Sequence, residues 1–228
     1  MTDSLRSWNL MHALSERILR ANSATDELER WCRDHAIGDG KLVAQCARQA
    51  RPEPLDDESL EAIYPYAGHG RSRFRKVHLA TAGIVLADAF NWFFPENLTP
   101  AICRKLDTTD IPFGRAIRHL SPHRRTYLVR RCMPGQFMDA DAARDPASTA
   151  FEHRAVVYDP DRVPLAVVHE RFRATLVWRI IADAPKSTNL QPAHHAGALA
   201  PGLTARLFQR HPHDFDVVSS GSATAASR

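Results

Sequence analysis

Two charged residues lie where strands usually carry apolar side chains. Arg75 is in phase with the apolar residues of an alternating segment, 75–81, and Glu170 lies in the same kind of position between Val168 and Phe172. In a β-strand, every second side chain points to the same face. Both charges are therefore expected on the buried face of a sheet, where an ionised group is costly unless it is paired or hydrogen-bonded.

Three explanations are open for these charges. They form a buried salt bridge with each other, or they lie at a sheet edge exposed to water, or they face a ligand pocket. In the third case, the Arg75 guanidinium would bind a ligand carboxylate through two parallel hydrogen bonds. Glu170 would then take a hydroxyl or a proton at the far end of the ligand, and exclusion of water would strengthen both contacts.

Hydrophobic periodicity and turn residues indicate the elements that would position these groups. Strands are expected over residues 41–48, 75–81, 84–94, 124–132, 149–158 and 165–178. Helices are expected over residues 4–20, after a Ser23 cap, and over 56–63 and 99–106. Strands joined by hairpins, with helices gathered at the front, indicate a single α+β domain built on an antiparallel β-sheet.

The composition fits one globular domain followed by a low-complexity segment. The chain has 228 residues, of which 44% are hydrophobic, so a substantial core can form. We expect a domain over residues 1–183 and a disordered C-terminal tail, rich in Ala, Pro, His, Ser and Thr, over 184–228. No apolar run approaches the ~18–20 residues of a membrane span. The N-terminus lacks the apolar stretch of a signal peptide, which favours a cytoplasmic protein.

Metal and nucleic-acid chemistry find little support in the sequence. The four cysteines form no CxxC pair and no His/Cys spacing suggests a zinc site, so no metal is predicted. The net charge of +4 fits a small anionic ligand as well as it fits nucleic acid. A basic run comprises Arg115, Arg118, Arg124, Arg125, Arg130 and Arg131. Because it lacks stacking aromatics beyond Tyr127, we interpret it as a solvated strand surface rather than a nucleic-acid site.

The order of these features resembles the chorismate pyruvate-lyase family. A helix opens after an Asn-Ser-Ala-Thr turn, an inward arginine precedes a glycine hairpin, and an aromatic strand ends at Pro95. A Pro-Phe-Gly-Arg turn follows, and a late strand contains Pro-Leu and Glu-x-Phe. The likeness extends over about residues 5–180. The wider chorismate lyase-like fold also includes ligand-sensing domains of bacterial transcription regulators.

The resemblance implies a sheet whose helical flaps close over a buried aromatic acid. It places Arg75 on the ring carboxylate and Glu170 on the ring hydroxyl. It places Phe113 and Gly114 in the turn that closes the pocket, and Ala24 in the helix-opening flap. Gly114 also has a plainer explanation, because a strand-entry turn can need its backbone angles. The implied reaction is elimination of pyruvate from chorismate to leave 4-hydroxybenzoate, with no cofactor.

One departure from the family keeps a second hypothesis open. The family has another arginine on the strand after the hairpin, and the matching residue here is Asn91, which carries no charge. Recognition of a second ligand carboxylate is therefore in question. The sequence supports a chorismate lyase-like enzyme, or a non-catalytic protein that binds or senses an aromatic acid on the same fold. In both cases the partner is a small aromatic or chorismate-like acid.

Overall fold

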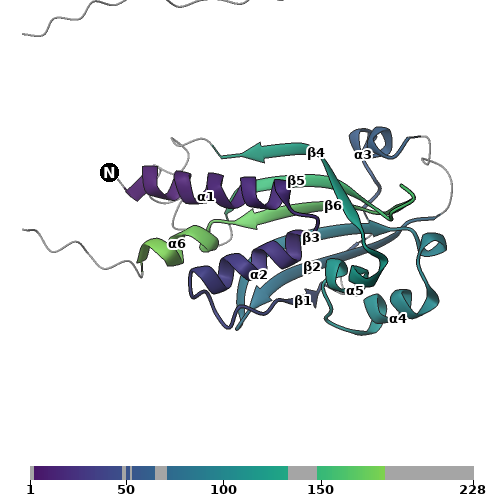
Figure 1. Ribbon diagram of the computed structural model, residues 1–228, viewed down its shortest axis with the longest axis horizontal. Coiled ribbons are helices and arrows are strands. Elements are labelled where there is room, and N and C mark those ends of the chain that lie inside the picture. The colour runs from purple at the N-terminus through teal and green to yellow at the C-terminus, as the bar shows by residue number, and fades with distance from the viewer. Residues whose placement is uncertain (1–2, 48–49, 52, 65–70, 133–147, 183–228) are drawn as a thin grey trace, which may run out of the picture. The chain divides into compact units, whose positions relative to one another are not determined.

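A six-stranded antiparallel sheet with the order β1-β2-β3-β6-β5-β4 forms the centre of the fold (Figure 1). The computed structural model describes residues 3–47, 50–51, 53–64, 71–132 and 148–182. The strands are β1 Val43–Cys46, β2 Arg73–Thr81, β3 Ile84–Phe93, β4 His123–Arg131, β5 Thr149–Tyr158 and β6 Pro164–Arg173. Every neighbouring pair is antiparallel, which confirms the predicted α+β class. The order puts β3 and β6, the strands of Asn91 and Glu170, in the middle of the sheet.

Helices pack around this sheet, and the second of them begins directly after its predicted cap. They are α1 Asp3–Arg20, α2 Ala24–Asp34, α3 Asp57–Ala62, α4 Pro100–Thr108, α5 Phe113–Ala116 and α6 Thr175–Ala182, with 3₁₀ turns at Pro95–Asn97 and Arg118–Leu120. As expected, Ser23 caps α2, and its side-chain oxygen accepts a hydrogen bond from the Asp26 N–H at 3.2 Å. This cap fixes the short junction between α1 and α2.

Different elements cover the two faces of the sheet. On one face, helices α1, α2 and α6 pack against the sheet in a core that includes Met11, Leu28, Leu86, Phe151 and Phe172. On the opposite face, α3 covers a smaller cluster built on Trp92, Val156 and Val167. Figure 1 shows α1 and α2 lying across the sheet and α3 at one end of it. Because side chains alternate along a strand, Asn91 and Glu170 point to the face that α1 and α2 cover.

The last predicted strand is too long. β6 stops at Arg173, and residues 175–178, expected in the strand, belong to α6 instead. The Ala174 N–H donates to Ser148 O at 2.9 Å, and pairing with β5 ends there. Leu176 and Val177 are both fully buried. Adjacent side chains of a strand point to opposite faces, whereas a helix can bury two adjacent side chains against the same surface. A short apolar run in the sequence does not distinguish a strand from a helix.

The described residues belong to one compact unit, Met1–Lys186, in agreement with a single domain. The predicted tail, 184–228, lies outside the described residues. Within the part of the chain that the structure describes, no helix is both long and apolar enough to cross a membrane.

A buried polar network fastens α3 to the sheet. The Ser59 hydroxyl lies 2.8 Å from Tyr127 OH and 2.9 Å from His169 Nε2, and Arg154 Nη1 donates to Asp56 Oδ2 at 2.6 Å. Burial, followed by the nearby charge of Arg154, lowers the pKa of His169 to about 4. The imidazole is therefore neutral in the folded protein at pH 7.

We expect folding stability to fall as the pH drops below about 6.5, the ordinary pKa of histidine. In this range the unfolded chain takes up a proton at His169, whereas the folded protein does so only at a pKa of about 4. Each such histidine then removes roughly 1 kcal/mol of stability per pH unit. Burial also lowers the pKa of His153, to about 3, so it adds to the slope. Between pH 6.5 and pH 4, the free energy of unfolding measured with urea should depend less steeply on pH in His169→Asn than in the wild type. An unchanged slope would contradict the lowered pKa of His169.

Candidate functional site

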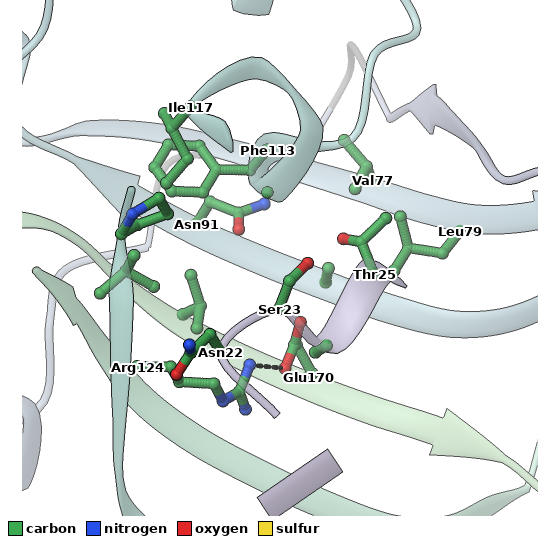
Figure 2. A pocket seen from close by; sticks show the side chains of 16 residues that line it. Asn22, Ser23, Thr25, Val77, Leu79, Asn91, Phe113, Ile117, Arg124 and Glu170 are labelled. Atoms are coloured by element: carbon green, nitrogen blue, oxygen red, sulfur yellow. Dashed lines mark hydrogen bonds and ion pairs between the residues drawn. The ribbon is translucent and has the colours of Figure 1, made fainter. Parts of the chain in front are cut away.

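A cavity lies on the helix-covered face, over the middle of the sheet (Figure 2). Its walls are apolar side chains of β2, β3, β5 and β6, namely Val77, Leu79, Ala89, Val157 and Val168. Two segments cover it: residues 22–25 at the α1–α2 junction, and Phe113, Gly114 and Ile117 in and just after α5. We call these two segments the roof. The cavity thus combines apolar walls with a roof that carries hydroxyl and amide groups.

A buried ion pair forms the charged end of the cavity. Arg124 Nη1 donates to Glu170 Oε2 at 2.5 Å, and the two side chains are only 4% and 9% exposed. Arg124 Nη2 is buried without a hydrogen-bond partner. Among the described residues, no hydrogen bond reaches Glu170 Oε1. Figure 2 shows the pair at the side of the cavity away from Phe113. One donor and one acceptor of this ion pair are therefore unused.

Five of the six predicted site residues line this one cavity: Ala24, Asn91, Phe113, Gly114 and Glu170. Asn91 is 4% exposed, and its Nδ2 donates to the backbone oxygen of Arg75 at 3.4 Å. Among the described residues no hydrogen bond reaches the amide oxygen of Asn91, so this oxygen stays available to the cavity.

Gly114 is favoured by close approach of neighbouring side chains rather than by its backbone angles. Its φ is not among the positive values of the described residues. A Cβ atom at this position would lie 3.1 Å from Thr25 Oγ1 and 3.3 Å from Ser23 Oγ. Glycine therefore lets α5 meet the start of α2, and this contact joins the two segments of the roof.

The sixth predicted residue, Arg75, does not line this cavity. It lies on the expected face of β2 and is buried, but its Nη1 and Nη2 donate to Ile111 O and Thr109 O, each at 3.0 Å. These carbonyls follow α4, where the helix dipole favours a cation. The expected arrangement, with Arg75 and Glu170 facing each other across one pocket, is not seen. Arg124 supplies the guanidinium of the cavity instead.

Replacing Arg75 by methionine is expected to lower stability and to leave ligand binding in the cavity unchanged. The variant loses two hydrogen bonds from a charged donor, which together are worth about 3 kcal/mol or more. Arg75→Lys, which keeps a cation near the same carbonyls, should lose less. Denaturant unfolding measures the stability and calorimetric titration the affinity. A folded Arg75→Met protein with weakened ligand binding would show that Arg75 does act in the cavity.

Sequence inspection missed Arg124 because it stands in a basic run. Arg124 and Arg125 are neighbours in β4, so their side chains must point to opposite faces of the sheet. Arg125 is exposed, whereas Arg124 turns inward beside its strand neighbour Val157, which also lines the cavity. The arginine doublet was itself a usable signal, because one of its two cations had to face the core.

His153 is next to Glu170 in the sheet but adds no charge to the ion pair. It is the strand neighbour of Glu170 on β5, is fully buried, and shares a hydrogen bond of 2.9 Å with Ser15 Oγ. Burial, helped by the charges of Arg124 and Arg131, lowers the pKa of His153 to about 3, so it is neutral at pH 7. Across the described residues, no group of three or more His, Cys, Asp or Glu side chains could hold a metal ion.

The cavity is small with the roof in this position. About 40 Å³ is accessible to water, which is room for about three water molecules, whereas a cavity that binds benzene measures about 150 Å³. A ligand with a ring or a branched hydrocarbon therefore requires the roof to move outward.

Comparison with known proteins gives likenesses of fold and one relative in sequence. No protein-family model matches the chain. It is similar to the effector domain of PhnF from Mycobacterium smegmatis, with a TM-score of 0.45 and 16% identity over 67% of this chain and 88% of that one. It is also similar to the effector-binding domain of the Bacillus subtilis trehalose repressor, with a TM-score of 0.33 and 13% identity over 58% of this chain and 91% of that domain. Such scores describe a partial likeness of fold, so function has to be argued from this chain's own side chains.

The relative in sequence is protein y4mC of Sinorhizobium fredii (strain NBRC 101917 / NGR234), which is described as uncharacterized. The two sequences are 30% identical over 177 residues, which cover 72% of this chain and 73% of the relative. The chain therefore belongs to the same protein family as y4mC.

Proposed function

We propose that this protein binds a small organic acid in the cavity around Arg124 and Glu170, and that it does not convert this acid chemically. The observation that supports this most directly is the unpartnered Nη2 of Arg124, a charged donor buried beside apolar walls. A buried donor without a partner costs free energy, and a ligand carboxylate would remove that cost. Hydrogen bonds between guanidinium and carboxylate groups are among the strongest in proteins.

The rest of the cavity suits the hydrocarbon part of such an acid. The apolar walls give contact surface, and burial of apolar area stabilises a complex by about 25 cal/mol per Å² before the costs of binding. In this proposal Ala24, Phe113 and Gly114 enclose the ligand from the roof. Asn91 offers an amide, and Ser23 offers a hydroxyl, to polar substituents on it.

Chorismate lyase chemistry is the finer hypothesis, and the cavity supports it less well than binding alone. Chorismate carries two carboxylates. Among the described residues that line the cavity, Arg124 is the one cation, and Glu170 already neutralises it. Asn91 is uncharged, and Arg75 is engaged with backbone carbonyls. A carboxylate without a cation in a dry site is costly, so we expect the purified protein to release no pyruvate from chorismate.

Binding can be tested with acids and their uncharged methyl esters. Acids that fit should stabilise the protein against heat, and a ligand at about 100 times its Kd adds about 2.7 kcal/mol. The esters should not, because they cannot pair with the guanidinium. Arg130→Met provides the matched control for Arg124→Met, since Arg130 is an exposed arginine of the same strand. Equal stabilisation by acids and esters, or equal binding by Arg124→Met, would rule out the proposal.

A further inference from the structure

We infer that the ligand of this cavity carries a cationic hydrogen-bond donor next to its acid group, as the ammonium and carboxylate of an α-amino acid do. This inference rests on the proposed function and adds the charge class of the ligand. It starts from the two unused atoms of the buried ion pair, Arg124 Nη2 and Glu170 Oε1. A ligand that brings only an acid group satisfies the first atom and leaves the second without a donor.

The charge balance of the cavity leads to the same class of ligand. The Arg124–Glu170 pair is electrically neutral before any ligand enters, and both side chains are at least nine-tenths buried. A monocarboxylate would therefore leave one net negative charge in a site shielded from water, and a dicarboxylate would leave two. Uncompensated buried charge is expensive. A zwitterion adds no net charge and so avoids this cost.

Other cations near the cavity are engaged elsewhere and cannot supply the missing positive charge. In the described part of the chain, Arg115 pairs with Glu29 and Arg118 pairs with Asp26. The two Nη groups of Arg75 donate to backbone carbonyls. The positive charge opposite Glu170 Oε1 has to come from the ligand itself.

The geometry of the pair suits one compact head group. Arg124 Nη1 and Glu170 Oε2 are in contact at 2.5 Å, so the two unused atoms belong to a single ion pair. The carboxylate of an amino acid can accept from Nη2 while its ammonium donates to Oε1. The apolar walls around Val77, Leu79 and Val168 would then receive an apolar side chain.

Matched ligands on one hydrocarbon frame test this inference by isothermal titration. Leucine is compared with its deamino acid, 4-methylpentanoate, and with its amine, 3-methylbutylamine. Phenylalanine is compared in the same way with 3-phenylpropionate and 2-phenylethylamine. We expect the amino acid to bind at least about tenfold more tightly than the deamino acid, because the deamino acid brings no donor for the Glu170 carboxylate. A deamino acid that binds as tightly as its amino acid would overturn the inference and leave the proposed function intact. Failure of every acid to bind would overturn the proposed function as well.

The Glu170→Gln variant should reverse the preference. Without the carboxylate, the guanidinium alone faces the ligand, so a monocarboxylate now neutralises the site and an amino acid leaves one positive charge in excess. Glu152→Gln is the matched control, because Glu152 is also a buried strand glutamate, paired with Arg154 at 2.6 Å on the opposite face of the sheet. The control should keep the wild-type preference. A Glu170→Gln protein that still prefers the amino acid would contradict the inference.

Discussion

The Arg124→Met variant is expected to lose acid binding altogether and to have a free energy of unfolding about 3–5 kcal/mol below that of the wild type. Methionine fills part of the space of the arginine stem but leaves the Glu170 carboxyl group, with a side chain only 9% exposed, without a cation beside it. Removing one member of a buried pair is costly because the other charge stays desolvated. Calorimetric titration measures the loss of binding, and urea denaturation measures the loss of stability.

The control for this variant lies on the same strand. Arg130 is exposed, so Arg130→Met should change stability by no more than about 0.5 kcal/mol and should leave binding intact. If Arg124→Met were as stable as Arg130→Met, Glu170 would have to find water or another donor, and the dry ion pair described above would not exist in solution.

Local signals in the sequence were sufficient for most of the elements that hold the site. Ser23 has the side chain and the following residues of a helix cap, and α2 starts where that cap predicts. Strict alternation around Val168 and Phe172 placed Glu170 on the covered face of β6, where the structure finds it. These predictions succeeded because each depends on a few neighbouring residues, whose pattern is fixed before tertiary packing acts.

Arg75 shows what local sequence patterns cannot predict, namely the contacts that a long side chain makes. Alternation fixes the face from which its side chain leaves β2, but the guanidinium sits at the end of a long flexible stem. Its destination is set by Thr109 and Ile111, more than thirty residues away, whose carbonyls are left open by the end of α4. For Arg124 the missing information was which of two adjacent arginines turns inward, and that depends on how β4 is placed against β5.

Removing both members of the ion pair separates its structural role from its role in binding. We expect the double variant Arg124→Met/Glu170→Leu to be at least as stable as the wild type, because well-packed apolar residues often replace a buried ion pair without loss. The same variant should bind no acid and no amino acid. Chemical denaturation and titration of the single and double variants form a complete cycle.

The pair on the other face of the sheet gives the contrasting case. Arg154 binds Glu152 and also Asp56 at the start of α3, so its removal should loosen that helix and cost stability even when Glu152 is replaced as well. Arg124 makes no such contact with a second carboxylate among the described residues. A pair that can be deleted without loss of stability contributes little to the fold, which leaves ligand binding as the reason for two buried charges in an apolar cavity. A double variant as unstable as Arg124→Met would instead assign the pair to the fold.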